Sequence, residues 1–97
     1  MKISEITDTQ IFSYMRVDDP TQGDITLLSI IKPAAKVFIA EHTALTIEQL
    51  DDHDDLTIAY LIIVEDMFDN RAMTVNSANL NRTVETILSM HSLNHIG

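Results

Sequence analysis

The stretch that decides the fold is Asp55–Met73, which reads DLTIAYLIIVEDMFDNRAM. In its first half, from Leu56 to Val64, almost no polar side chain interrupts the apolar residues. A helix that is apolar nearly all round is one that neighbouring elements bury on several sides. The second half gains acidic residues and opens a polar face. We therefore expect a central helix from about residue 55 to residue 73.

Little in the rest of the chain opposes helices. There are only two Gly and two Pro among 97 residues, and no Asn-Gly or Asp-Gly hairpin turn. Helices are therefore favoured, and the expected fold class is all-α: a small bundle of about four to five helices around the central one. A chain of this length suits one domain. Residues 1–97 are expected to form it, with a flexible loop near 74–80 and a mobile C-terminal tail.

Two capping patterns indicate where short helices begin. Thr7–Gln10 and Thr46–Gln49 both have the spacing of a capping box, in which each side chain bonds the backbone amide of the other residue. The first predicts a short helix over about 8–15. The second predicts a short helix that ends in the acidic turn 51–55.

Apolar residues at helical spacing predict a longer helix from residue 23 or 24 to about 42. Pro33 lies inside this pattern, where it lacks a backbone donor and clashes with the preceding turn. We therefore expect a kink or a one-turn break near 29–32. A last helix is expected over about 81–92.

The charge balance narrows the possible partners. Fifteen Asp and Glu against six Lys and Arg give a net charge of −9, and the basic residues are scattered. Tight nucleic-acid binding needs clustered Lys and Arg that neutralise phosphates, so DNA is not expected as a ligand, although it can be a neighbour. The chain has no cysteine, which fits assembly in the cytosol. Its longest apolar run, Leu61–Val64, is far short of the ~20 residues of a membrane span.

Two sets of residues are candidate metal ligands. The turn Asp51–Asp55 carries four carboxylates, but they do not alternate and no Gly follows, as a calcium loop requires. A solvated helix start is the preferred interpretation. His91 and His95 share the i, i+4 spacing of a zinc pair that takes a third ligand from elsewhere, yet the Glu of a zinc protease motif is absent. We expect no metal and no cofactor.

Little in the sequence indicates a catalytic site. Glu65 and Asp69 share a helical spacing and could exchange a proton, but no cleft is expected around them. The chain has no Gly-rich phosphate loop and no nucleophile elbow. We do not expect an enzyme.

Arg71 stands near the predicted end of the central helix, where a cation suits the helix dipole. Asp69 is two positions away, and Glu65 and Asp66 are also poorly spaced for it, so these residues do not face it on a helix. Its partner is then expected on another helix or another subunit. The alternative is a surface arginine that caps its own helix end.

Several short motifs stand in a fixed order along the chain: Ile11, Arg16-Val17-Asp18-Asp19, Ala34-Ala35, Phe38-Ile39 and Phe68-Asp69-Asn70-Arg71. In the order and spacing of these motifs, the chain resembles the head–tail connector proteins, also called adaptor or head-completion proteins, of long-tailed double-stranded DNA bacteriophages. In that family the central helix typically ends in an aromatic residue, an acid, Asn and Arg, and a polar loop and a short Leu-rich helix follow. Phe68 stands where Tyr is more usual, and Pro33 is unexpected.

The resemblance implies a structural virion protein at the head–tail interface, assembled in the host cytoplasm. Copies would form a ring, dodecameric in the virion, that sits below the portal protein, extends the DNA channel and joins the head to the stopper or tail-completion protein. DNA would pass through without specific binding, because an acidic wall repels phosphate. The implied interface candidates are Phe68, Asp69, Asn70, Arg71, Arg16 and Arg82. The alternative class is a small acidic helical regulatory or protein-binding module.

Overall fold

The computed structural model describes residues 1–71 and 82–93, and within these ranges every regular element is helical. The order is a 3-10 helix η1 (Ile3–Glu5), α1 (Asp8–Tyr14), α2 (Gln22–Thr43), a second 3-10 helix η2 (Glu48–Asp52), α3 (Asp55–Asn70) and α4 (Arg82–Leu93). The predicted all-α bundle is thus confirmed. The loop predicted near 74–80 and the end of the C-terminal tail lie outside the described residues. No helix within the described ranges is long and apolar enough to cross a bilayer.

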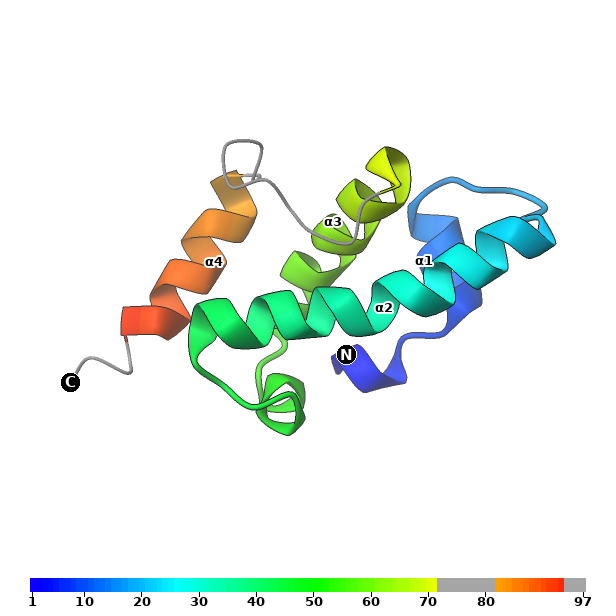
Figure 1. Ribbon diagram of the computed structural model, residues 1–97. Helices are drawn as coiled ribbons and strands as arrows, with labels where there is room; N and C mark the ends of the chain where they lie inside the picture. Colours follow the sequence, from blue (N-terminus) through cyan, green and yellow to red (C-terminus); the bar gives the residue numbers. More distant parts are fainter. Residues whose placement is uncertain (72–81, 94–97) are drawn as a thin grey trace.

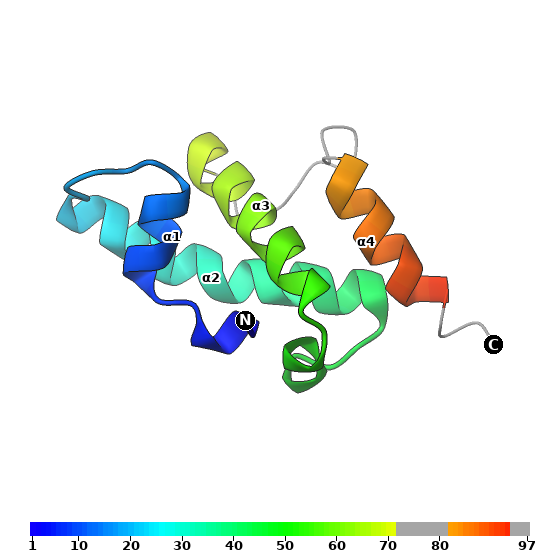
Figure 2. The ribbon, with the colours of Figure 1, turned by 180° about the vertical axis from the view of Figure 1, so that it is seen from behind.

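The longest helix, α2, forms the base on which the others pack (Figure 1). Helices α3 and α4 both contact it and also contact each other. Seen from behind, α3 and α4 lie in front of α2, and α1 lies near its start (Figure 2). The central helix α3 contacts α2, α4 and η1, so three other elements pack on it.

Most of α3 is buried, but not all of it. Eight of its residues face the core: Leu56, Thr57, Ala59, Tyr60, Ile63, Val64, Met67 and Phe68. Ile58 is 53% exposed, so the run of apolar residues did not mean burial on every side. The helix ends at Asn70, a little before the predicted end. Arg71 takes the left-handed conformation there, with φ 52° and ψ 40°, which terminates an α-helix.

Helix α2 is continuous from Gln22 to Thr43. The one-turn break predicted near 29–32 is therefore wrong. Pro33 and Ser29 are both exposed, so the Ser29 carbonyl that loses its amide partner at Pro33 faces water. A backbone acceptor in water is not left unsatisfied, and the helix tolerates the proline.

Both predicted capping boxes are confirmed. The Thr7 amide donates to Gln10 Oε1 at 2.9 Å, and the Thr46 amide donates to Gln49 Oε1 at 2.9 Å. A third box starts α2, where the Thr21 amide donates to an Asp24 carboxylate oxygen at 3.0 Å. These local bonds satisfy amides that have no partner within their own helix.

Candidate functional site

The Phe68–Arg71 motif forms the end of α3. Phe68 is buried and meets the ring of Phe12 edge-on, with centroids 6.1 Å apart. The Asn70 side-chain amide donates to the Asp66 carbonyl at 2.8 Å. The Arg71 guanidinium lies 5.3 Å from the centre of the Phe68 ring, and no ion pair joins it to another described residue. Within one chain the motif therefore closes its own helix. Of the two sources expected for a partner of Arg71, another helix and another subunit, the first is not found among the described residues.

Arg16 and Arg71 share an unusual backbone. Both have a positive φ, 61° at Arg16 and 52° at Arg71, and both are exposed. The Arg16 and Val17 amides return to the carbonyls of Ser13 and Phe12, which is the Schellman pattern of a helix end. Gly normally fills such a position, because another residue loses roughly 1–2 kcal/mol there. The ends of α1 and α3 are brought together by their two phenylalanines, whereas Arg82 lies apart, exposed at the start of α4.

Helix α2 exposes aliphatic residues on the side away from the core. Its buried residues are Leu28, Ile31, Ala35, Ile39 and Thr43. With 3.6 residues per turn, Ile30 and Val37 fall on the opposite side, where they are 51% and 44% exposed. Pro33 lies on the same side and is also exposed. We call Ile30, Pro33 and Val37 the α2 outer face.

Helix α3 has a comparable outer face. Ile58 is opposite the buried residues of its helix, and Ile62, one turn later on the same side, is half-buried. We call Ile58 and Ile62 the α3 outer face. Because α2 and α3 contact each other and each outer face is opposite the buried side of its own helix, the two outer faces point away from each other.

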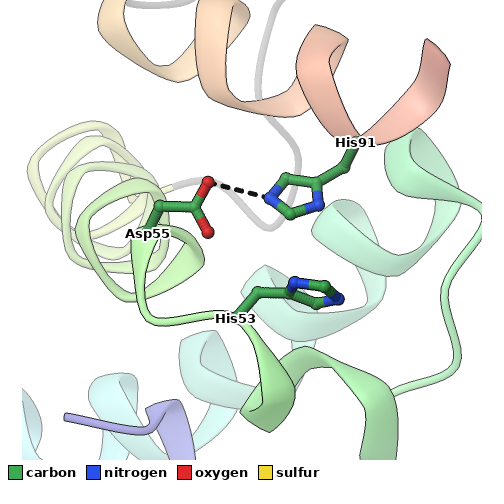
Figure 3. A group of neighbouring side chains, drawn as sticks. All are labelled: His53, Asp55 and His91. Carbon is green, nitrogen blue, oxygen red and sulfur yellow. Dashed lines mark hydrogen bonds and ion pairs between the residues drawn. The ribbon is translucent and has the colours of Figure 1, made fainter. Parts of the chain in front are cut away.

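A group of three polar side chains meets where α3 begins and α4 ends: His53, Asp55 and His91 (Figure 3). Asp55 is the first residue of α3, and His53 lies in the turn before it. Nε2 of His91 lies 2.8 Å from Oδ2 of Asp55. The two imidazole rings are 4.5 Å apart at their centres. One potential ligand atom from each residue lies within 4.8 Å of the other two.

The three residues differ in exposure. The His91 side chain is 10% exposed and the Asp55 side chain 42%, while His53 is half-buried. His91 follows Val84 and Leu88 on the inner side of α4, and its hydrogen bond to Asp55 satisfies an imidazole that is almost out of water. The cluster therefore fastens α4 to the first turn of α3, and its carboxylate side is open to solvent.

The acidic turn does not form a calcium loop. The Asp51 carboxylate accepts the Ser4 amide at 3.1 Å, Asp54 lies 3.8 Å from the terminal amine of Met1, and Asp55 turns to His91. Hydrogen bonds from Ser4 hold the pKa of the Asp51 carboxyl below its usual value. The first two carboxylates are thus directed at the N-terminal segment and the third at α4, so they do not converge on one point.

The other candidates from the sequence do not gather into a site. Asp69 is exposed and Glu65 half-buried on the outside of α3. His95, the proposed partner of His91, lies outside the described residues. The structure pairs His91 with Asp55, 36 positions away, and with His53. His53 was not among the candidates, and its one signal in the sequence was its place two residues before Asp55.

Comparison of the chain with protein-family models, with curated proteins and with solved structures gives no match. A functional proposal therefore depends on the residues and contacts described above.

Proposed function

We propose that the chain is a head–tail connector subunit of a long-tailed bacteriophage, a structural protein of the virion with no enzymatic role. Copies would form the ring below the portal protein that extends the DNA channel and receives the stopper or tail-completion protein. The observation that carries the proposal is the pair of apolar outer faces, one on α2 and one on α3, on opposite sides of a single small domain.

Two different patches on opposite sides favour head-to-tail association. A patch that binds its own copy gives a closed dimer, whereas a patch that binds a different patch gives a ring when the rotation closes. The α2 outer face of one copy would contact the α3 outer face of the next. Ile30, Val37 and Ile58 are each about half exposed, so such a contact would remove large aliphatic side chains from water.

The free energy gained by covering these side chains is too small for the ring to form without the portal. Covering the exposed half of one aliphatic side chain contributes about 1 kcal/mol, so the three together contribute roughly 3 kcal/mol. Association loses about 4–15 kcal/mol of translational and rotational freedom, and copies of net charge −9 repel one another. Free chains are therefore expected to be monomers. A portal ring that binds many copies would raise their effective concentration.

The exposed arginines supply positive charge on an acidic surface. Arg16 and Arg71 keep a long cationic side chain at positions where Gly would be less strained. A residue held in a sparsely populated conformation motivates a functional hypothesis. We assign these two side chains, together with Arg82, to carboxylates of a neighbouring copy or of the portal.

The test combines the purified chain with portal rings of the same phage, followed by sedimentation and electron microscopy. Ile30→Asp and Ile58→Asp should each abolish the ring, because each disrupts one of the two contacting faces. Ile47→Asp is the matched control, since Ile47 is 47% exposed and lies outside both faces. Circular dichroism of each variant checks that the fold is kept.

Mixing the two variants tests the head-to-tail arrangement. The Ile30→Asp chain keeps its α3 outer face and the Ile58→Asp chain keeps its α2 outer face, so one intact contact remains. Dimers that contain one copy of each variant, but no rings, are expected on the portal. Complete rings from either variant alone would refute the proposed contact. Binding of single copies without any ring, by the unchanged protein, would favour the small acidic binding module instead.

A further inference from the structure

We propose that His53, Asp55 and His91 bind a zinc ion that fastens α4 to the first turn of α3. The proposal is independent of the connector function, because none of these residues belongs to either outer face. It also replaces the expectation that the chain has no metal site. That expectation considered His91 only with His95, its neighbour on the same helix.

The donor set suits zinc. Two imidazole nitrogens and one carboxylate oxygen, with water in the fourth position, are a known tetrahedral arrangement. With Zn–N and Zn–O distances of about 2.0–2.2 Å, the ligand atoms of such a site are roughly 3.4 Å apart. The His91 and Asp55 atoms are 2.8 Å apart, and all three ligand atoms lie within 4.8 Å of one another. Binding thus requires a small opening between His91 and Asp55 and a small approach of His53.

The position of each residue allows this adjustment. His91 is nearly buried on α4 and would be the fixed ligand, while the Asp55 side chain is 42% exposed and can rotate. His53 precedes α3 and is half-buried. When Nε2 of His91 binds the ion, the proton that lies between it and Oδ2 of Asp55 must leave this nitrogen. A neutral imidazole would then carry its proton on Nδ1, and an imidazolium would release one proton to solvent, since zinc takes a neutral imidazole and an ionised carboxylate.

His53 distinguishes a metal site from a simple hydrogen-bonded clasp. A clasp between α3 and α4 requires only Asp55 and His91. Within the described residues, the His53 ring contacts the His91 ring and forms no side-chain hydrogen bond. A third donor is thus held beside the pair, and Figure 3 shows the three side chains facing one space.

The experiment is calorimetric titration of the full-length, chelator-treated protein with zinc chloride. A single ion per chain is expected. Asp55→Asn and His53→Ala should each weaken binding by at least about tenfold, because even residues that only orient zinc ligands change affinity about 10–100-fold. The matched controls are Asp52→Asn, with the same charge change at an exposed neighbour, and His42→Ala, at an exposed histidine on α2. Both should stay within about twofold of the unchanged protein.

His95→Ala separates the two possible histidine pairs, and it should leave the affinity unchanged. Loss of binding in His95→Ala with full binding in His53→Ala would place the ion on the helical pair of His91 and His95 and overturn the proposal. An equal loss in Asp52→Asn and Asp55→Asn would indicate diffuse attraction by the acidic turn, which also overturns it. So would the absence of saturable binding. As an independent readout, cobalt in place of zinc should give the visible absorption of a four-coordinate ion, and His53→Ala should weaken it.

Discussion

The most direct test of the fold compares the same substitution at two positions of α3. Ile63 is 1% exposed and faces the core, whereas Ile58 is 53% exposed on the α3 outer face. Both lie within α3, which spans Asp55–Asn70, so Ile→Ala at each position has a similar intrinsic effect on helix formation. The two variants therefore differ only in the packing that is lost.

The expected difference between the two variants is a large fraction of the free energy of unfolding. A domain of this size unfolds with about 5–15 kcal/mol. Ile63→Ala removes a buried side chain and leaves a cavity, which costs about 2–5 kcal/mol. Ile58→Ala loses only part of a half-covered side chain, and Ala regains a few tenths of a kcal/mol of helix propensity. Its net effect should stay below about 1 kcal/mol.

Urea unfolding followed by helical circular dichroism measures both variants. The urea midpoint should fall strongly for Ile63→Ala and hardly at all for Ile58→Ala. The slope of the free energy of unfolding against urea concentration should be the same for both variants. In thermal unfolding the melting temperature of Ile63→Ala should fall by roughly 8–40 °C, since 1 kcal/mol corresponds to about 4–8 °C in a domain of this size. Measurements at two protein concentrations exclude a contribution from association. Equal losses would refute the packing of α3, because Ile58 would then have to be covered within the monomer.

Three further predictions concern single positions. Pro33→Ala should raise the free energy of unfolding by about 1–3 kcal/mol, because Ala restores an amide to the Ser29 carbonyl; no gain in urea unfolding would mean that α2 is interrupted there. Ala44→Gly should add about 0.5–1 kcal/mol, because Ala44 has a φ of 58° at the end of α2, and a lowered urea midpoint would contradict this. Burial, and next the Asp8 charge, raise the pKa of Tyr60 to about 12 from an ordinary value of 10.0. The folded state therefore keeps the phenol protonated longer than the unfolded state does, and the stability that this provides below pH 10 is lost between pH 10 and 12. Tyr60→Phe should remove that part of the decline, and parallel pH curves for the two proteins would rule it out.

The starts of helices could be predicted because their determinants are local. In the boxes at Thr7 and Thr46 the two partners lie three residues apart. Thr21 and Asp24 form the same arrangement with Asp in place of Glu or Gln, and the start of α2 was accordingly placed a little late. The ends of helices were harder to predict. Arg16, Ala44 and Arg71 all adopt left-handed conformations, where the usual signal would be Gly.

The second limit on prediction from the sequence was the burial and the direction of individual groups. The apolar run in α3 predicted its central position but not that Ile58 would face outward. The consequence of Pro33 depends on whether the freed carbonyl points to water or to the core, and this is fixed only when α2 packs. Both outcomes are properties of the tertiary arrangement and not of local spacing.

Local sequence patterns could not predict the candidate site for the same reason. His91 and Asp55 are 36 positions apart and come from different helices. Spacing on one helix drew attention to His91 and His95, because i, i+4 pairs are visible in a sequence. The packing of α4 on α3 instead placed His91 beside Asp55 and His53. The signal in the sequence was the position of His91 on the inner side of an amphipathic helix, because a buried imidazole needs a hydrogen-bond partner.

Helix α4 buries few side chains, and this affects which part of the protein unfolds locally. Among its side chains up to residue 91, α4 buries Val84, Leu88 and His91, whereas α3 buries eight residues. Native proteins open in cooperative units, and the unit with the fewest buried contacts opens at the lowest free energy. Amide hydrogens of α4 should then exchange with solvent sooner than those of α3, through transient detachment of one helix while the rest of the bundle stays folded. A zinc ion shared by both helices would slow the exchange of the α4 amides selectively.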